Sequence, residues 1–252
     1  MKPTFLYHLL TLALLLCGMV MPSLQAQPYK NPSLSPEERT ADLLQRMTLE
    51  EKIAQIRHIH SWNIFEEQEL NKSKLQEFVG DLCWGFVEGF PLTGENCHRH
   101  MRHIQEYMLN HTRLGIPIFT VAEALHGSVH EGSTIYPQNI ALASTFNPEL
   151  AYLRATEISK ELHYQGINQI LAPCIDVVRD LRWGRIEESY GEDPYLNGIF
   201  AYKEAKGYLD NGISPMLKHY GAHGNPLGGL NLASVHCGIG ELHDVYLQPF
   251  KK

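Results

Sequence analysis

The sequence predicts an α/β protein in which helices cover a parallel sheet. Short β-rich apolar runs alternate with amphipathic helical segments along the chain. Loops rich in charged and imidazole side chains follow these runs, at positions 123–130, 176–194 and 218–236. Residues of this kind at the carboxyl ends of strands are typical of both barrels and open α/β sheets. The composition is that of an ordinary globular protein, with 44% hydrophobic and 19% charged residues.

Two helix starts open the chain. Ser35-Pro36-Glu37-Glu38 and Thr48-Leu49-Glu50-Glu51 both carry the pattern of a capping box. Residues 66–79 are also expected to be helical, and residues 84–87 to form a short buried strand. The side chains expected to be buried in this part are Leu43, Leu44, Met47, Ile53 and Ile56.

The remaining segments continue the alternation. We expect helices at 100–114, from Asn147 to a stop at Gly166, from Asp193-Pro194 to Gly212, and at 240–250. Between them, strands are expected at 116–121, 167–175 and 213–217. The apolar residues expected to face inward on the second and third of these helices are Leu150, Leu153, Ile158, Leu162, Leu196, Ile199, Phe200 and Leu209.

Residues 1–26 are predicted to be a signal peptide. Lys2 precedes an apolar run from Leu9 to Val20, and a cleavage zone follows that ends in Ala26. The run is shorter than the roughly 20 residues that a spanning helix needs. We therefore expect export, periplasmic or secreted, with no membrane attachment after cleavage and residues 27–252 as the mature domain. A net charge of -7 without a basic run excludes nucleic acid as an expected partner.

No metal or cofactor is predicted. The cysteines lack a framework spacing, so Cys83, Cys97, Cys174 and Cys237 are expected to be buried or free thiols, with a single disulfide left open. The pairs His126/His130 and His219/His223 have the spacing of a helical metal site. Both pairs fall in glycine-containing loops, where that spacing does not place them on one face. A P-loop ending and a G-x-S-x-G elbow are also absent from the sequence.

Three constellations carry the candidate chemistry. Glu123 and His126 follow one strand, Lys218 and His219 follow another, and the loop from Arg179 to Pro194 lies between them in the chain. Carboxylate, ammonium and guanidinium groups can all bind the hydroxyls of a sugar, and an indole face can pack against its C–H face. Structural ion pairs explain each motif about equally well when it is taken alone.

Together, these motifs resemble glycoside hydrolase family 3. The resemblance lies in Glu123-Ala-Leu-His-Gly, in Arg179-Asp-Leu-Arg-Trp-Gly-Arg with the following Glu188-Ser and Gly191-Glu-Asp-Pro, and in Lys218-His-Tyr, in that order. It runs from about Pro36 to the carboxyl end. It implies an amino-terminal (β/α)8 TIM-type barrel and exo-acting, retaining hydrolysis of β-glucosides or β-xylosides.

The resemblance also implies roles for particular residues. Glu123, Arg185, Lys218 and His219 match the positions that bind the sugar, with Trp183 and Glu188 supporting Arg185. The expected partner is an oligosaccharide or β-glycoside. Many relatives have Asp at the position of Glu123, so the sugar preference stays open.

The catalytic residues of the family find no match in this sequence. The nucleophile of the family is an Asp in a Ser-Asp-type motif on a later barrel strand, and no such motif follows Lys218. Only about four strand–helix units are expected, whereas a complete barrel has eight. We therefore expect the amino-terminal part of an incomplete barrel, inactive alone, from a truncated gene, a split gene or a partial record. The missing carboxyl-terminal half of the enzyme would then be a partner. The alternatives are a non-catalytic carbohydrate-binding pseudoenzyme and a non-functional truncated product.

Overall fold

The computed structural model describes residues 27–89 and 93–252, so the predicted signal peptide lies outside the described residues. The chain divides into two compact units, Met1–Lys52 and Ile53–Lys252. Each unit is described by itself below.

The first unit contains a short 3-10 helix, η1 (Pro28–Lys30), followed by α2 (Pro36–Arg46) and most of α3 (Leu49–Ala54). Both predicted capping boxes are present, because Ser35 and Glu38 bond reciprocally and so do Thr48 and Glu51. The predicted burial is partly wrong, since Leu44 is 48% exposed. Within its unit, α2 packs against the short η1 turn, which is too small to cover a whole apolar stripe. Ile53 and Ile56, at the start of the second unit, are exposed as well.

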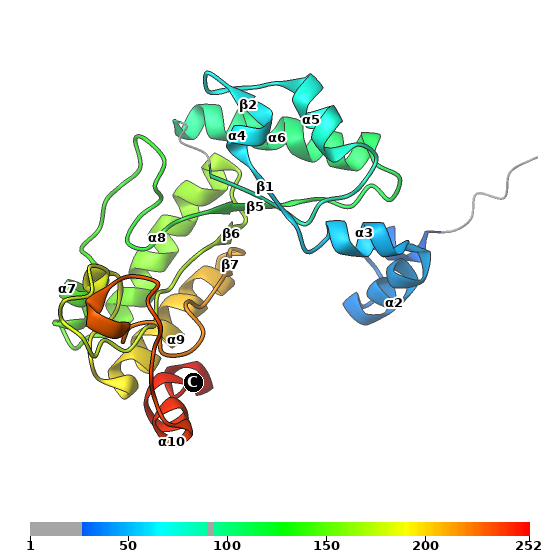
Figure 1. Cartoon of the computed structure of the whole chain (residues 1–252). Helices are drawn as coiled ribbons and strands as arrows, with labels where there is room; N and C mark the ends of the chain where they lie inside the picture. Colours follow the sequence, from blue (N-terminus) through cyan, green and yellow to red (C-terminus); the bar gives the residue numbers. More distant parts are fainter. Residues whose placement is uncertain (1–26, 90–92) are drawn as a thin grey trace, which may run out of the picture. The chain divides into compact units, whose positions relative to one another are not determined.

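The second unit is built on the predicted parallel sheet. Its five strands are β1 (His58–His60), β4 (Phe86–Glu88), β5 (Phe119–Ala122), β6 (Gln169–Ile170) and β7 (Ser214–Pro215). They lie in the order β1-β4-β5-β6-β7, with every neighbouring pair parallel. Helices α6 (Gly94–His111), α8 (Glu149–Gln165) and α9 (Pro194–Asp210) connect the strands and run alongside them (Figure 1). This is the βα alternation of a barrel, of which five strands are present in the described chain.

Helix α9 begins, and helix α8 ends, as the sequence predicts, whereas α6 begins earlier than expected, at Gly94, and no side chain caps the start of α8. The Asp193 side chain caps α9 by accepting a bond from the amide of Leu196, with Pro194 at the first position. Gly166 ends α8 in the left-handed conformation. The strands are shorter than predicted, because residues 171–178 have no regular secondary structure apart from an isolated bridge between Cys174 and Lys218.

Several expectations are wrong. Residues 66–79 are helical only in α5 (Lys72–Val79), because the chain first makes a hairpin of β2 (Phe65–Glu66) and β3 (Glu69–Leu70). Its turn has positive φ at Glu67 and Gln68, two residue types that favour helices, so the pattern gave no sign of it. Strand β1 was not predicted at all. Residues 240–250 form three short helical pieces, α10 (Ile239–Glu241), η4 (Leu242–Tyr246) and η5 (Pro249–Lys251), instead of one helix.

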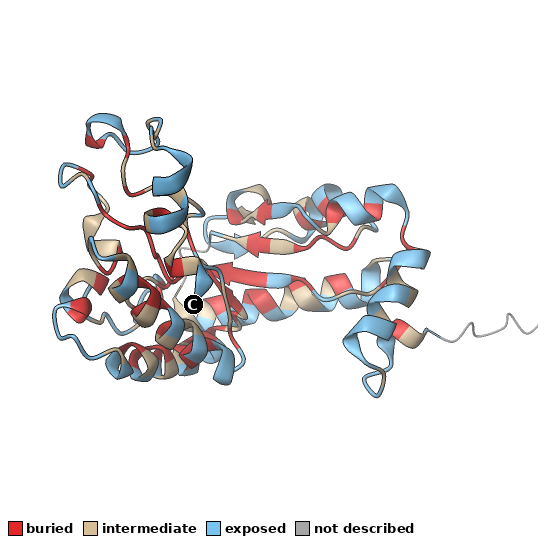
Figure 2. Cartoon of the chain, turned by 90° about the horizontal axis from the view of Figure 1, so that it is seen from below, coloured by how far each residue is buried: buried red, intermediate tan, exposed pale blue. Residues whose placement is uncertain are grey.

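Buried residues gather along the strands and on the helix faces turned toward them (Figure 2). The main core includes Ile59, Val87, Ile104, Ile158 and Ile170. On the helices, however, Leu153 and Leu209 are 56% and 62% exposed, against expectation. The contact between α8 and α9 instead uses small residues, since a Cβ on Gly207 would lie 2.8 Å from the Cβ of Ala155.

A buried ion pair joins α8 to α9. Arg154 lies 2.7 Å from Glu204, and their side chains are 4% and 0% exposed. The Arg154 guanidinium also donates to the side-chain oxygen of Asn139 on α7 (Asn139–Ala143), and Asn139 donates to the backbone carbonyl of Glu188. The Tyr190 hydroxyl donates to Glu204 as well. These buried contacts therefore fix the position of the loop that contains Arg185 and Glu188.

Candidate sugar-binding site

Three neighbouring strands bring the candidate residues to one edge of the sheet. Glu123 follows β5, Asp176 lies in the segment after β6, and Lys218 and His219 follow β7. Because parallel neighbours end on the same side, side chains far apart in the sequence meet there.

Lys218 is fixed against Glu123. Its ammonium nitrogen lies 2.9 and 2.8 Å from the two carboxylate oxygens of Glu123. The Lys218 side chain is only 11% exposed, whereas the Glu123 side chain is 40% exposed. An ammonium has three donors and a carboxylate about four acceptor positions, so the pair keeps bonding capacity on the open side of Glu123. Such a pair can accept bonds from adjacent hydroxyls.

His219 is oriented by a buried carboxylate. Its Nδ1 lies 2.7 Å from Oδ2 of Asp176, and its backbone amide donates to Oδ1 at 3.3 Å. The Asp176 side chain is 1% exposed, while the His219 side chain is 31% exposed. With Nδ1 bonded to the carboxylate, Nε2 of the imidazole is left for a ligand.

Arg185 joins the same cluster through His223. Its guanidinium forms two bonds to Glu188, of 2.8 and 2.7 Å, and a longer contact of 3.4 Å to Nε2 of His223. The ring of His223 lies 4.2 Å from that of His219. Hydrogen bonding to Glu188 raises the pKa of Arg185, so its charge is secure. Burial first, and the neighbouring His219 second, lower the pKa of His223.

The four predicted residues therefore form one connected arrangement, from Glu123 through Lys218 and His219 to Arg185. Trp183 lies beneath it. Its indole is 1% exposed, bonds to Asn231 and meets the ring of His223 edge-on, so it supports the site and offers no face to a sugar. Sequence reasoning gave no role to Asp176. The signal that could have found it is its place directly after a strand, in line with the other polar residues.

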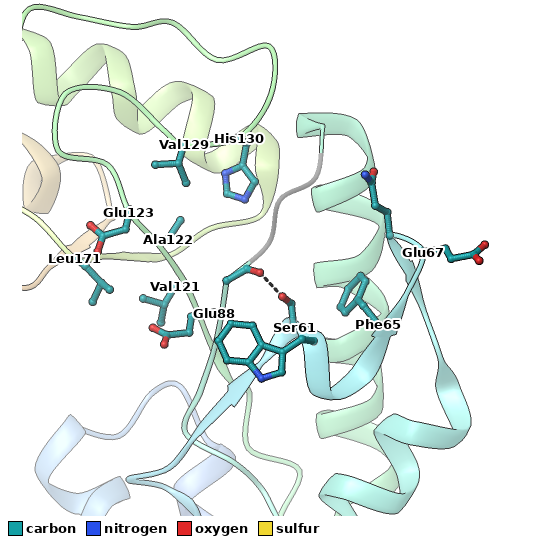
Figure 3. Close-up of a pocket in the computed structure, with 13 residues that line it drawn as sticks. Ser61, Phe65, Glu67, Glu88, Val121, Ala122, Glu123, Val129, His130 and Leu171 are labelled. Carbon is teal, nitrogen blue, oxygen red and sulfur yellow. Dashed lines mark hydrogen bonds between the residues drawn. The ribbon is translucent and has the colours of Figure 1, made fainter.

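A cavity of about 650 Å³ adjoins Glu123 (Figure 3). Val121, Ala122 and Glu123 form its strand side, and Phe65 lies across from them. Glu88 also lines it and approaches the imidazoles of His58 and His60 at 3.4 and 3.1 Å. This volume is within the usual range for a site that holds a small molecule.

Of the histidine pairs that the sequence offers as metal ligands, His126 and His130 are each bonded to other partners. His126 bonds to the carbonyl of Tyr136, and His130 bonds to Ser128 and contacts Cys97. In the described part of the chain, the one group of three side chains with metal-ligand geometry is Cys174, Asp176 and His219. Cys83, Cys97, Cys174 and Cys237 are all free thiols.

A parallel α/β sheet with paired charges and a cavity at its carboxyl edge defines a class of protein, the α/β enzymes that bind polar small molecules at this edge. A family model narrows the class. The model of the glycosyl hydrolase family 3 N-terminal domain matches residues 48–252, and this chain belongs to that family. The five parallel strands are accordingly part of a (β/α)8 TIM-type barrel, as the sequence predicts.

Individual relatives agree with the family model. The chain is 34% identical over 241 residues to a protein of Formosa agariphila whose name assigns it, provisionally, to the β-xylosidases, covering 90% of this chain and 32% of the relative. It is 31% identical to a periplasmic β-glucosidase of Salmonella typhimurium, covering 92% and 30%. A solved β-glucosidase of Erythrobacter marinus superposes with a TM-score of 0.83 at 30% identity, covering 90% and 31%. The chain thus spans about a third of the length of these relatives. None of its helices, within the described residues, is long and apolar enough to cross a membrane.

Proposed function

We propose that this chain is the sugar-binding part of an exported, retaining β-glycosidase that releases terminal β-linked sugars. The observation that carries the proposal is the Glu123–Lys218 pair beside the Asp176–His219 pair. A half-exposed carboxylate, a fixed ammonium and an oriented imidazole together offer acceptors and donors to adjacent hydroxyls of one sugar ring. The names of relatives, both β-xylosidases and β-glucosidases, support a β-glucoside or β-xyloside as the substrate class.

We further propose that the 252-residue chain binds the sugar without cleaving the glycoside. Retaining hydrolysis needs a nucleophilic carboxylate and a second carboxyl group about 5–5.5 Å apart. Four carboxylates at this edge already have partners: Glu123 is paired with Lys218, Asp176 with His219, Glu188 with Arg185, and Glu88 with His58 and His60. They are placed to hold and orient, which favours binding over nucleophilic attack.

Export is part of the proposal. It is supported by the predicted signal peptide and by similarity to a protein named as periplasmic. Cell fractionation with a carboxyl-terminal tag tests it. Recovery of the tagged chain only from the cytoplasm would contradict export.

Binding and turnover are measured together. We expect saturable binding of glucose or xylose by saturation-transfer NMR, and no release of p-nitrophenol from p-nitrophenyl β-glucoside or β-xyloside. Glu123→Gln keeps the shape but removes the charge that holds Lys218, so binding should weaken about tenfold or more. Glu187→Gln, in the loop that contains Arg185 but outside these pairs, is the control. Failure of both sugars to bind refutes the proposed site, and turnover abolished by Glu123→Ala refutes the inactivity.

A further inference from the structure

Cys174 joins Asp176 and His219 at the base of the site, through a contact that the sugar-binding proposal does not require. The Cys174 thiol donates to Oδ2 of Asp176 at 3.1 Å, and Nδ1 of His219 lies 2.7 Å from the same oxygen. The thiol sulfur, a carboxylate oxygen and an imidazole nitrogen all lie within 4.8 Å of one another. Backbone contacts keep them in place, because the amide of Ile175 donates to the carbonyl of Lys218 at 2.7 Å and the amide of Lys218 donates to that of Pro173.

The charge balance around this group favours a cation. Lys218 and Arg185 are each paired with their own carboxylate, Glu123 and Glu188. Asp176, with its side chain 1% exposed, is bonded to a thiol, an imidazole and a backbone amide. Among the described residues no Lys or Arg side chain donates to Asp176, and a buried carboxylate is stabilised by a cation close to it.

We propose that Cys174, Asp176 and His219 form a binding site for a thiophilic divalent cation such as Zn²⁺. Zn²⁺ is usually bound by thiolate at about 2.3 Å, by imidazole at about 2.0–2.1 Å and by carboxylate at about 2.0–2.2 Å. Where the protein supplies three ligands, water commonly takes the fourth position. Ligand atoms on a tetrahedral ion are therefore roughly 3.3–3.6 Å apart. The three ligand atoms here lie within 4.8 Å of one another, which is close to this arrangement. The single sulfur and nitrogen ligands favour Zn²⁺ over Mg²⁺ or Ca²⁺.

The exposure and protonation of the three side chains decide how the metal ion enters and how tightly it binds. The ion enters past His219, whose side chain is partly exposed, since Cys174 and Asp176 are buried. Binding releases the thiol proton to solvent, and the imidazole proton moves through solvent from Nδ1, where it bonds to Asp176, to Nε2, so that Nδ1 can bind the ion. Because the thiol must lose its proton to bind, the ion binds more tightly as pH rises.

The test uses the full chain after chelator treatment, with Co²⁺ as the spectroscopic probe and Zn²⁺ as the competitor. We expect one Co²⁺ per chain, visible bands of a tetrahedral ion, and a near-ultraviolet charge-transfer band from the thiolate. Zn²⁺ should remove all of these bands, whereas Mg²⁺ should not. Octahedral Co²⁺ spectra without a thiolate band would overturn the proposal.

Three variants assign the ligands. Cys174→Ser should remove the thiolate band and weaken binding by roughly tenfold or more, since even the loss of a residue supporting a ligand costs 10–100-fold. Cys237→Ser, at a partly exposed free thiol, is the matched control and should leave the spectrum unchanged. His219→Ala keeps the thiolate band but weakens binding, and it remains informative should the buried Cys174→Ser variant not fold. A thiolate band that survives in folded Cys174→Ser, or that is lost in Cys237→Ser, would overturn the assignment. Because no sugar is present, failure here leaves the proposed function untouched.

Discussion

Replacing Arg154 with Met tests how the interior supports the site loop. Arg154 donates to Glu204 at 2.7 Å, to Asn139 at 2.5 Å and to the carbonyl of Pro137 at 2.9 Å. The substitution keeps an apolar stem of similar length but leaves Glu204, a fully buried carboxylate, without its cation. Breaking one side of a buried ion pair costs about 3–5 kcal/mol. That is a large part of the roughly 5–15 kcal/mol by which domains are stable.

The cost should depend on pH with a definite sign. Burial raises the pKa of Glu204, and Arg154 opposes that shift, so the variant raises the pKa further. A carboxyl group whose pKa is raised in the folded state favours folding at low pH and loses that contribution as pH increases. The destabilisation by Arg154→Met should therefore be smaller near pH 4 than at pH 7. Adding Glu204→Gln should recover part of the loss at pH 7, because it removes the unpaired charge.

Urea unfolding measures the free energy of unfolding, followed by fluorescence of the buried Trp183 and by circular dichroism. Lys160→Met is the control, since this residue of the same helix pairs with Glu157 while its side chain is 64% exposed. It should change stability little. A loss below about 1 kcal/mol for Arg154→Met, or no recovery in the double variant, would refute the reasoning, because a buried pair costs several kcal/mol to break.

Three further predictions concern separate parts of the fold. Gly207→Ala should lower the free energy of unfolding in urea by about 1–3 kcal/mol, because the new Cβ would lie 2.7 Å from a backbone oxygen of α8. Gly184→Ala is the control, since a Cβ there has no atom within 4 Å and should leave the stability unchanged. Equal losses in the two variants would contradict this prediction. Asp193→Ala should cost about 1 kcal/mol in thermal unfolding by removing the cap of α9, and no change would show that the cap is dispensable. NMR titration should find the pKa of His223 below that of an ordinary histidine, because its imidazole is partly buried. Since the folded state then resists protonation of this ring, its contribution to stability is present at neutral pH and is lost as pH falls. A raised pKa would contradict the geometry.

The sequence by itself determined the class of fold and the positions that carry the site. Capping boxes at Ser35 and Thr48 depend on a few neighbouring residues, so local pattern suffices to find them. The alternation of strands and helices likewise predicted a parallel sheet. Because polar residues at the ends of parallel strands must share an edge, Glu123, Lys218 and His219 could be grouped without coordinates.

Only the tertiary structure decided which partner each of these residues has. Asp176 holds His219 across 43 positions of sequence, and Glu123 holds Lys218 across 95. Periodicity carries no information about such pairs, since it describes one segment at a time. The same limit hid the hairpin at Glu67 and Gln68, the burial of Trp183 and the meeting of Cys174 with His219. Each depends on contacts between segments, which exist only once the chain has folded.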